Sequence, residues 1–313
     1  MRVVFMGTPD FAVGTLRALV EAGHDVVGVF TQPDKPKGRG KAMQPTPVKE
    51  AALEYGIPVY QPRRVREPEV FEILKELAPE VIVVVAFGQI IPQSILDLQP
   101  YGCINVHASL LPKYRGAAPI QWAVIDGEDV SGVTIMKMDA GIDTGDMISK
   151  VIVPITKEET GESLFDKLST AGAKLLMETL PSLADGTAIY EKQPAESPTP
   201  YAAMIKKELG DIDWNKTAVE LERLIRGLNS WPSAYTKVNG KTLKIWKAEV
   251  VMKKTRDFVL PGTVLQADAK GFLVQTGQDI LSIQELQLEG KKRMDASAFL
   301  RGYSVEIGSV LPS

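Results

Sequence analysis

Uninterrupted runs of aliphatic residues alternate with helical periodicity through the first half of this chain. Continuous apolar runs are typical of strands buried on both faces, as in a parallel sheet that helices cover. The predicted strands are 3–6, 26–30, 81–85, 103–107, 133–138 and 147–153. Helical patterns occupy 11–22, 48–55, 69–77, 119–125 and 163–183. This alternation predicts an α/β fold with a doubly wound, mainly parallel sheet.

The pattern changes after a proline-rich stretch at 193–200. One helix is predicted at 218–228, and short β-patterned segments follow at 234–238, 243–251, 262–266, 272–275 and 280–286. Asn239-Gly240 is a strong hairpin signal between the first two of these segments. Such short strands predict a small barrel or sandwich, plausibly OB-like. We therefore expect an α/β domain at 1–188, a linker at 189–205 and a smaller β-barrel domain at 206–313.

Composition indicates an ordinary globular protein, with 44% apolar and 24% charged residues. The single cysteine, Cys103, cannot form an internal disulfide, which fits a reducing compartment. Apolar runs stay below the ~20 residues that a membrane span needs. The chain opens on a predicted strand rather than on a signal-peptide pattern. We expect a cytoplasmic protein without a membrane partner.

The two halves differ in charge. Residues 206–313 carry 17 Lys+Arg and 13 Asp+Glu, whereas residues 1–205 carry 19 and 26. A basic C-terminal part on an acidic protein points weakly to a polyanionic partner, because solvated surfaces also produce such imbalances.

Three polar residues form the main candidate site. The spacing of Asn105 and His107 places them on one face of a predicted strand, whose exit lies at the ligand-binding edge of such a sheet. Asp143 lies in a turn-rich loop after another strand. An amide and an imidazole can stabilise an oxyanion, and an imidazole and a carboxylate can relay protons. The set favours chemistry at a carbonyl carbon, although its spacing fits satisfied core polar groups and a turn cap equally well.

Other catalytic motifs are incomplete. The segment after Gly7 lacks the further glycines of a dinucleotide fingerprint, and Gly38–Lys41 is too short for a P-loop. No G-x-S-x-G elbow surrounds Ser109, which argues against a serine hydrolase. The two histidines are far apart in the sequence and the cysteine stands alone, so no metal is expected.

The stretch from Asn105 to Ile120, together with Asp139–Asp146, resembles the signature of the 10-formyltetrahydrofolate-dependent formyltransferases. Met6–Ala12 and Gln32–Lys41 also match, and the likeness runs through nearly the whole chain. It is closest to the family members that formylate methionyl initiator tRNA. The resemblance implies a Rossmann-like formyltransferase domain with an OB-like C-terminal domain. It also implies 10-formyltetrahydrofolate as co-substrate and initiator methionyl-tRNA as partner, in translation initiation.

The family's functional residues carry over onto matching positions. The catalytic trio would be Asn105, His107 and Asp143. The folate site would comprise the turn Ser109, Leu110, Leu111 and Pro112, with Phe87, Gly88 and Ile90 from the wall that holds the pterin. Phe11 is similar to an aromatic residue near the methionyl side chain. The tRNA acceptor stem would meet Lys35, Lys37, Arg39 and Lys41, in a loop whose composition alone indicates a flexible, solvated segment.

Several alternatives remain at this point. Within the class, the acceptor of the formyl group could be a sugar nucleotide, a purine precursor or water. From another class, the chain could be an RNA-binding module on an inactive α/β domain. The cationic loop and the basic C-terminal region favour tRNA, and two further basic clusters, Lys253–Arg256 and Lys291–Arg293, could extend a phosphate-binding surface. We expect a monomer.

Overall fold

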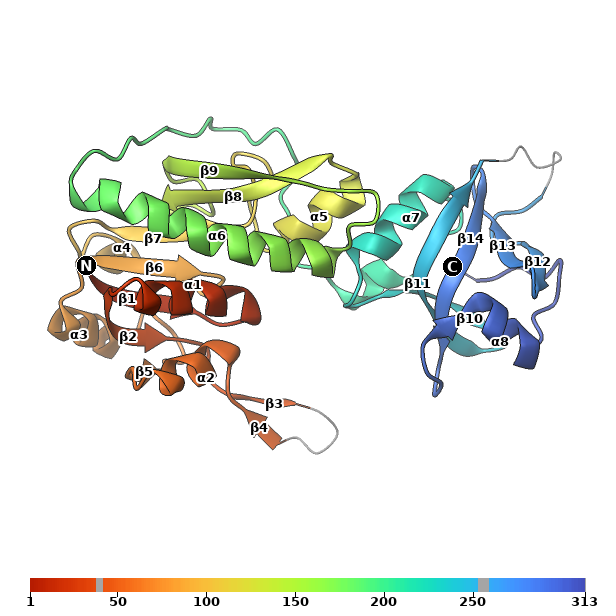
Figure 1. Cartoon of the computed structure of the whole chain (residues 1–313), viewed down its shortest axis with the longest axis horizontal. Coiled ribbons are helices and arrows are strands. Elements are labelled where there is room, and N and C mark those ends of the chain that lie inside the picture. The colour runs from red at the N-terminus through yellow and green to blue at the C-terminus, as the bar shows by residue number, and fades with distance from the viewer. Residues whose placement is uncertain (38–41, 253–258, 313) are drawn as a thin grey trace. The chain divides into compact units, whose positions relative to one another are not determined.

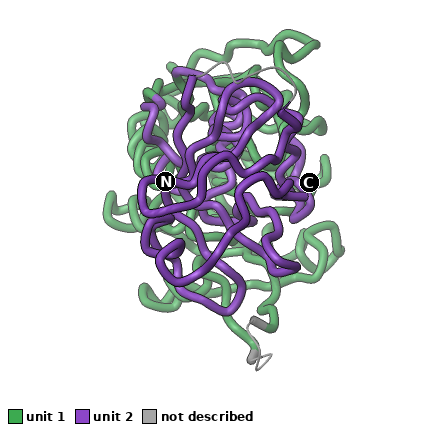
Figure 2. Tube along the Cα trace, turned by 90° about the vertical axis from the view of Figure 1, so that its right-hand side faces the viewer, with its two compact units in different colours: residues 1–119, 130–154, 165–202 green, residues 120–129, 155–164, 203–313 purple. Residues whose placement is uncertain are grey.

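The computed structural model describes residues 1–37, 42–252 and 259–312. The chain divides into two compact units (Figure 2). Unit 1 contains residues 1–119, 130–154 and 165–202, and unit 2 contains residues 120–129, 155–164 and 203–313. The domain limits expected from the sequence, 1–188 and 206–313 with a linker between them, stay a prediction.

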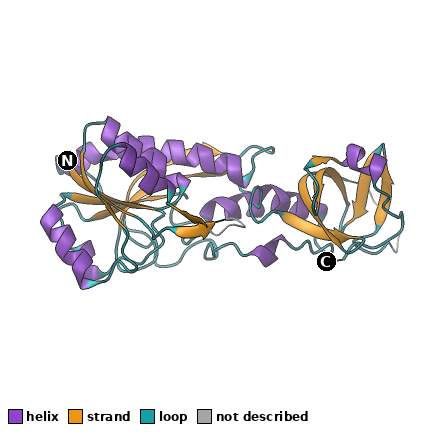
Figure 3. Ribbon diagram, turned by 90° about the horizontal axis from the view of Figure 1, so that it is seen from below, coloured by secondary structure: helices purple, strands orange, loops and turns teal. Residues whose placement is uncertain are grey.

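Unit 1 is built on a mainly parallel sheet with helices on both sides (Figures 1 and 3). Within the described residues, its strand order is β5-β2-β1-β6-β7-β8-β9. The parallel strands are β1 (Arg2–Gly7), β2 (Asp25–Phe30), β5 (Val59–Tyr60), β6 (Val81–Val85) and β7 (Cys103–His107). Two antiparallel strands, β8 (Val130–Lys137) and β9 (Met147–Pro154), complete one side. The predicted doubly wound α/β class is confirmed.

The helices predicted from periodicity are present in this part of the chain, together with one short helix that the pattern did not predict. They are α1 (Asp10–Glu21), α2 (Pro47–Glu54), α3 (Pro68–Leu77), α4 (Gln93–Leu96), α5 (Pro119–Asp126) and α6 (Gly161–Ala184). The central strands β6 and β7 are buried along their whole length, as their continuous apolar runs predict. β1 ends at Gly7, where a side chain has no room, because a Cβ would lie 2.8 Å from the Ala12 Cβ and 3.0 Å from the Val85 carbonyl oxygen. The first turn of α1 therefore packs close to the sheet.

Unit 2 carries an antiparallel sheet, consistent with a barrel-like domain. Its described strands run in the order β10-β11-β14-β13-β12, and β15 pairs with β14. They are β10 (Ala234–Val238), β11 (Lys241–Val251), β12 (Val264–Asp268), β13 (Gly271–Gln275), β14 (Ile280–Leu288) and β15 (Met294–Asp295). Within residues 203–313 the described helical segments are η1 (Lys207–Gly210), α7 (Ala218–Gly227) and α8 (Ala296–Gly302). The predicted hairpin turn is present, with positive φ at Asn239 and Gly240 as a type I′ turn requires.

The structure adds short elements that the sequence pattern did not reveal. β3 (Lys35–Lys37) and β4 (Ala42–Gln44) form an antiparallel pair inside the segment expected to be a flexible loop. Each strand is three residues long, and β3 consists of lysine and proline, so neither gives an alternation that a pattern could detect. Over the described ranges, no helix is long and apolar enough to cross a membrane.

Candidate active site

The carboxyl end of β7 brings the three predicted catalytic residues together. Asn105 and His107 are only 8% and 6% exposed, and they point to the same side of the strand. The Asn105 Nδ2 donates to Asp143 Oδ1 at 3.5 Å, and the His107 Nδ1 lies 3.7 Å from that same oxygen. The carboxylate oxygen is therefore shared by an amide and an imidazole.

The His107 ring has a fixed orientation. Its Nε2 lies 3.0 Å from the backbone carbonyl oxygen of Tyr114. Because a carbonyl oxygen can only accept, Nε2 must carry a hydrogen, and Nδ1 is the nitrogen that faces Asp143. A proton on Nδ1 creates an imidazolium beside a carboxylate, so this position can hold and release a proton during a reaction.

Asp143 is held by backbone as well as by side chains. It lies in the loop between β8 and β9 with φ +54°, a left-handed conformation that aspartate tolerates better than most residues. The Gly116 amide N–H donates to its Oδ2 at 2.9 Å, which leaves Oδ1 to face Asn105 and His107. Each carboxylate oxygen thus has a separate set of partners.

The Ser-Leu-Leu-Pro turn follows β7 and is braced by β8. Thr134 Oγ1 donates to the Ser109 carbonyl oxygen at 2.7 Å and accepts from the Leu111 N–H at 3.1 Å. Ser109 and Leu111 are each only 1% exposed. The other two residues, Leu110 and Pro112, line a cavity of about 390 Å³. Lys113, Tyr114, Val130, Ser131 and Pro198 complete the cavity wall.

The predicted folate wall lies after β6, beside the end of β7, because these strands pair in parallel. Phe87 is buried in the core at 2% exposed, and its carbonyl oxygen accepts from Thr8 Oγ1 and Gln32 Nε2 at 3.1 and 3.2 Å. Gly88 is exposed with φ +79°, and Ile90 is 79% exposed. Only Gly88 and Ile90 of this set therefore present side-chain or Cα surface to solvent.

The remaining predicted residues are spread more widely. The Phe11 ring is buried and packs edge-to-face on Phe165, with 5.2 Å between ring centroids. Lys35 is exposed on β3, and Lys37 ends the same strand. Arg39 and Lys41 lie outside the described residues, as does the cluster Lys253–Arg256.

The basic cluster at Lys291–Arg293 is partly engaged within unit 2. The Arg293 Nε donates to Glu285 Oε2 at 2.7 Å, and its guanidinium lies 4.9 Å from the centroid of the Trp246 ring. Lys291 and Lys292 are exposed. Two exposed cations therefore remain for a polyanion on this segment.

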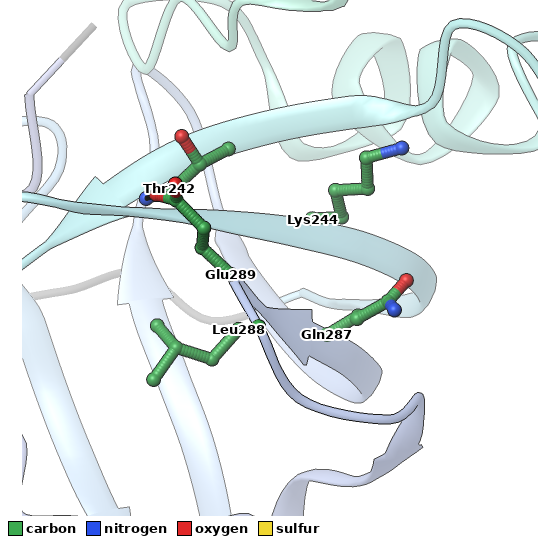
Figure 4. Close-up of a pocket in the computed structure, with 6 residues that line it drawn as sticks. Thr242, Lys244, Gln287, Leu288 and Glu289 are labelled. Carbon is green, nitrogen blue, oxygen red and sulfur yellow. Dashed lines mark hydrogen bonds between the residues drawn. The ribbon is translucent and has the colours of Figure 1, made fainter. Parts of the chain in front are cut away.

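A second cavity, of about 340 Å³, lies on β11 and β14 (Figure 4). Its wall consists of Thr242, Lys244, Gln287, Leu288, Glu289 and Gly290. One lysine and one glutamate balance its charge, and none of the predicted site residues lines it. This cavity has no arrangement comparable to the acid–imidazole–amide set of unit 1.

Metal and thiol chemistry have no support in the described part of the chain. No group of three or more His, Cys, Asp or Glu side chains there could hold a metal ion. Burial raises the pKa of the Cys103 thiol to about 12, so this side chain stays protonated and unreactive.

The pattern of the sequence missed several residues that shape this site. The Tyr114 carbonyl group and the Gly116 N–H act through backbone atoms, which residue type does not reveal. Thr134 is a buried polar residue inside a predicted strand, and such a position is a usable signal. Gln193 donates to backbone carbonyls of the Asp143 loop from 50 residues away, and nothing in the sequence links the two.

The doubly wound sheet brings Asn105 and His107 of β7 and Asp143 of the β8–β9 loop together, and comparison with known families places the chain in the formyl transferase class. The model of the formyl transferase family matches residues 1–180, and that of the formyl transferase C-terminal domain matches residues 204–304. Within this class, the chain belongs to the family of methionyl-tRNA formyltransferases. It is 61% identical to the methionyl-tRNA formyltransferase of Agathobacter rectalis, over 99% of both chains. It is 50% identical to that of Geobacter sulfurreducens, over 99% of this chain and 96% of the relative.

Solved structures of low sequence identity share the fold. The sugar 3N-formyltransferase WlaRD, solved with dTDP and 5-N-formyltetrahydrofolate, superposes with a TM-score of 0.66 at 20% identity, over 93% of this chain and 98% of WlaRD. HypX from Aquifex aeolicus, in complex with tetrahydrofolic acid, gives a TM-score of 0.63 at 18% identity over 99% of this chain. This chain spans about 50% of the length of HypX.

Proposed function

We propose that this protein transfers the formyl group of 10-formyltetrahydrofolate to the amino group of methionyl initiator tRNA. The product, N-formylmethionyl-tRNA, serves translation initiation. One observation carries the proposal. The Asn105 amide and the His107 imidazole both face Oδ1 of Asp143, at the ligand-binding edge of the sheet. Full-length relatives named methionyl-tRNA formyltransferase support the choice of acceptor.

The reaction forms a bond from the methionyl nitrogen to the formyl carbon and breaks the bond from that carbon to the folate nitrogen. Negative charge builds on the formyl oxygen, which needs donors already in place. The Asn105 amide has a second N–H besides the one directed at Asp143, and it is suited to this task. His107, on the same face of β7, is proposed as the second group that stabilises this charge.

Two proton transfers must accompany the reaction. The attacking amine loses a proton and the departing folate nitrogen gains one. Asp143 accepts hydrogen bonds from Gly116 and Asn105 and faces His107, so it orients the imidazole and assists transfer between the two nitrogens.

The folate co-substrate is assigned to the strand ends beside the trio. The Ser109–Pro112 turn contributes Leu110 and Pro112 to an existing cavity, while Ser109 and Leu111 fix the turn from inside. The segment after β6 contributes Gly88 and Ile90, and buried Phe87 holds that segment in place. Phe11 is assigned to the methionyl pocket, where its packing on Phe165 would support the pocket wall.

The acceptor tRNA is assigned to the cationic segment that contains Lys35, Lys37, Arg39 and Lys41, with the basic part of unit 2 as a further phosphate-binding surface. The protein is proposed to act as a monomer in the cytoplasm, because a single chain supplies the whole trio and initiator tRNA is charged there.

The decisive assay follows formyl transfer from 10-formyltetrahydrofolate to methionyl initiator tRNA. Uncharged tRNA and a sugar-nucleotide amine serve as controls. Formylmethionyl-tRNA as the product supports donor, acceptor and the role of the basic segments together. Consumption of the donor without this product would keep the folate chemistry and assign another acceptor, or water.

A further inference from the structure

The amide of Gln193 bridges the Asp143 loop and a buried arginine. Its Nε2 donates to the carbonyl oxygens of Asp143 and Gly145, at 2.9 and 2.7 Å. Its Oε1 accepts from Nε and Nη2 of Arg115, at 3.0 and 2.9 Å. Carbonyl oxygens only accept and a guanidinium only donates, so the orientation of the amide is fixed by its neighbours. Gln193 uses its full hydrogen-bonding capacity here.

Arg115 and Gly116 approach Asp143 from two sides. The Gly116 N–H binds the carboxylate, and Arg115 reaches the carbonyl group of the same residue through Gln193. One dipeptide therefore controls both the side chain and the backbone of Asp143. These contacts fix the position of the Asp143 loop relative to the Ser-Leu-Leu-Pro turn, which precedes Arg115 and Gly116 in the chain.

The segment that carries Gln193 is itself fastened to unit 1. The Ser197 Oγ donates to the Pro112 carbonyl oxygen at 2.8 Å, and Thr199 Oγ1 accepts from the Tyr114 N–H at 2.7 Å. Residues 193–202, here called the strap, thus follow the motif from Pro112 to Gly116. The strap lies within the segment that the sequence marks as a linker.

The buried charge of Arg115 contributes little to the stability of the fold. Arg115 is 8% exposed, and its hydrogen-bond acceptors are neutral: Gln193 Oε1 and the carbonyl oxygens of Pro194 and Ala195. No ion pair within 4.0 Å offsets its charge among the described residues. Burying a charge without a counter-ion costs free energy, and well-packed apolar residues in place of buried ionic groups are often neutral or stabilising. A functional role accounts for the cost better than stability does.

We propose that Gln193, held by Arg115, is a positioning residue that keeps Asp143 directed at Asn105 and His107. This inference rests on the proposed function, because it assigns Gln193 a part in the same reaction. Gln193 touches no reacting atom, and it acts only through the Asp143 loop.

The substitution Gln193→Glu isolates this contact. It keeps the side chain's size and its bond to Arg115, but it places a carboxylate oxygen against the carbonyl oxygens of Asp143 and Gly145. We expect kcat to fall between about 10-fold and 10²-fold with KM for tRNA and folate little changed, since small misplacements of catalytic groups have effects of this size. The matched control is Gln278→Glu, the same change at an exposed position of unit 2, which should keep the wild-type kcat.

A double-mutant cycle with Asp143→Asn separates positioning from general destabilisation. Asparagine tolerates the left-handed backbone of this position and removes the charge. If Gln193 acts through Asp143, adding Gln193→Glu to Asp143→Asn lowers kcat by less than about twofold, because the two losses are not additive. A full additional loss in the double variant would overturn the proposal. Gln193→Met, which removes the bonds without adding a charge, repeats the cycle should Gln193→Glu fail to fold.

A spectroscopic readout is independent of turnover. The chain has two histidines, so the ring-nitrogen signals of His107 are assigned with one His24→Gln variant. We expect these signals to shift in Gln193→Glu and to stay unchanged in Gln278→Glu. Unchanged His107 signals with wild-type kcat would refute the positioning role while leaving the proposed function intact. Absence of formyl transfer by the wild-type enzyme would refute the function instead.

Discussion

The Gly116 N–H and the Asp143 carboxylate are joined by a 2.9 Å hydrogen bond across 27 positions of sequence. Gly116 can make this contact because its φ is +127° and it has no side chain. A Cβ there would lie 2.6 Å from the Ala202 carbonyl oxygen. The glycine of this motif is therefore needed both for its backbone conformation and for the space beside the strap.

Gly116→Ala should consequently lower both stability and kcat. The Cβ must push Ala202 away, and the N–H then loses its alignment with Asp143. The control is Gly56→Ala, where φ is +65° but nothing lies within 4 Å of an added Cβ. That variant should show only the strain of a left-handed backbone, about 1–2 kcal/mol, with kcat unchanged. Thermal melts and steady-state kinetics on both proteins test this, and equal kcat in the two would count against the contact.

Asn105→Ala should reduce kcat by about 10²–10³-fold, as expected for the loss of one oxyanion donor. Binding of methionyl-tRNA should weaken far less, because the amide is needed chiefly in the transition state. The measurement is kcat beside a tRNA Kd, with Asn215→Ala at an exposed position of unit 2 as control. His107→Ala should behave similarly. Comparable losses in kcat and in tRNA affinity would contradict the assigned roles.

Arg39→Ala should raise KM for tRNA and leave folate affinity unchanged, because a phosphate contact acts on the acceptor alone. The slope of log KM against log salt concentration should decrease by about 1, which corresponds to the loss of one phosphate contact. Lys174→Ala, an exposed lysine on α6, is the control for general loss of charge. A changed folate Kd would argue against a tRNA role for this segment.

The contribution of Asp34, next to the cationic segment, to the stability of the fold should depend on pH. Hydrogen bonds from the Lys49 ammonium and the Gln61 amide hold the pKa of Asp34 below its ordinary value. The carboxylate therefore stabilises the fold above its unfolded pKa of about 3.9, and this contribution is lost as pH falls through the lower folded value. Wild type should melt higher than Asp34→Asn at pH 6, with the gap closing in stronger acid. A gap that does not depend on pH would show that the charge is not involved.

Cys103 should resist alkylation in the native protein at pH 8. Burial raises its pKa to about 12, so almost no thiolate is present, and the side chain is enclosed as well. Mass spectrometry after iodoacetamide treatment should find one modified thiol only when urea has unfolded the chain. Rapid labelling without denaturant would mean that this part of the sheet opens readily.

Periodicity and residue type were enough to predict most of the fold and the closeness of Asn105, His107 and Asp143, whose catalytic role stays a prediction. The continuous apolar runs of β6 and β7 predicted buried parallel strands, and the two-residue spacing of Asn105 and His107 predicted their shared face. The turn-rich loop after a strand indicated Asp143, and the resemblance to formyltransferases supported the choice of all three residues. Each of these signals is local, or is carried by the chemistry of a side chain.

What the sequence could not provide depends on backbone atoms and on distant contacts. The Tyr114 carbonyl group that orients His107 could belong to any residue type. Gln193 lies in a proline-rich stretch that resembles a linker by composition, yet it is 7% exposed. Its partners became neighbours only through the path of the chain after α6. The β3–β4 hairpin was missed because each strand is three residues long.

The position of the strap in the sequence also determines when, during synthesis, the site can be completed. The sheet of unit 1 is complete in sequence once β9 has been made, and α6 ends at Ala184. The groups that restrain Asp143 and Gly116, however, include Gln193 and Ala202. A nascent chain that stops between these points already contains Asn105, His107 and Asp143 but lacks the residues that fasten them. If Gln193 positions Asp143 as proposed, catalytic competence depends on the last stretch of unit 1 to be synthesised.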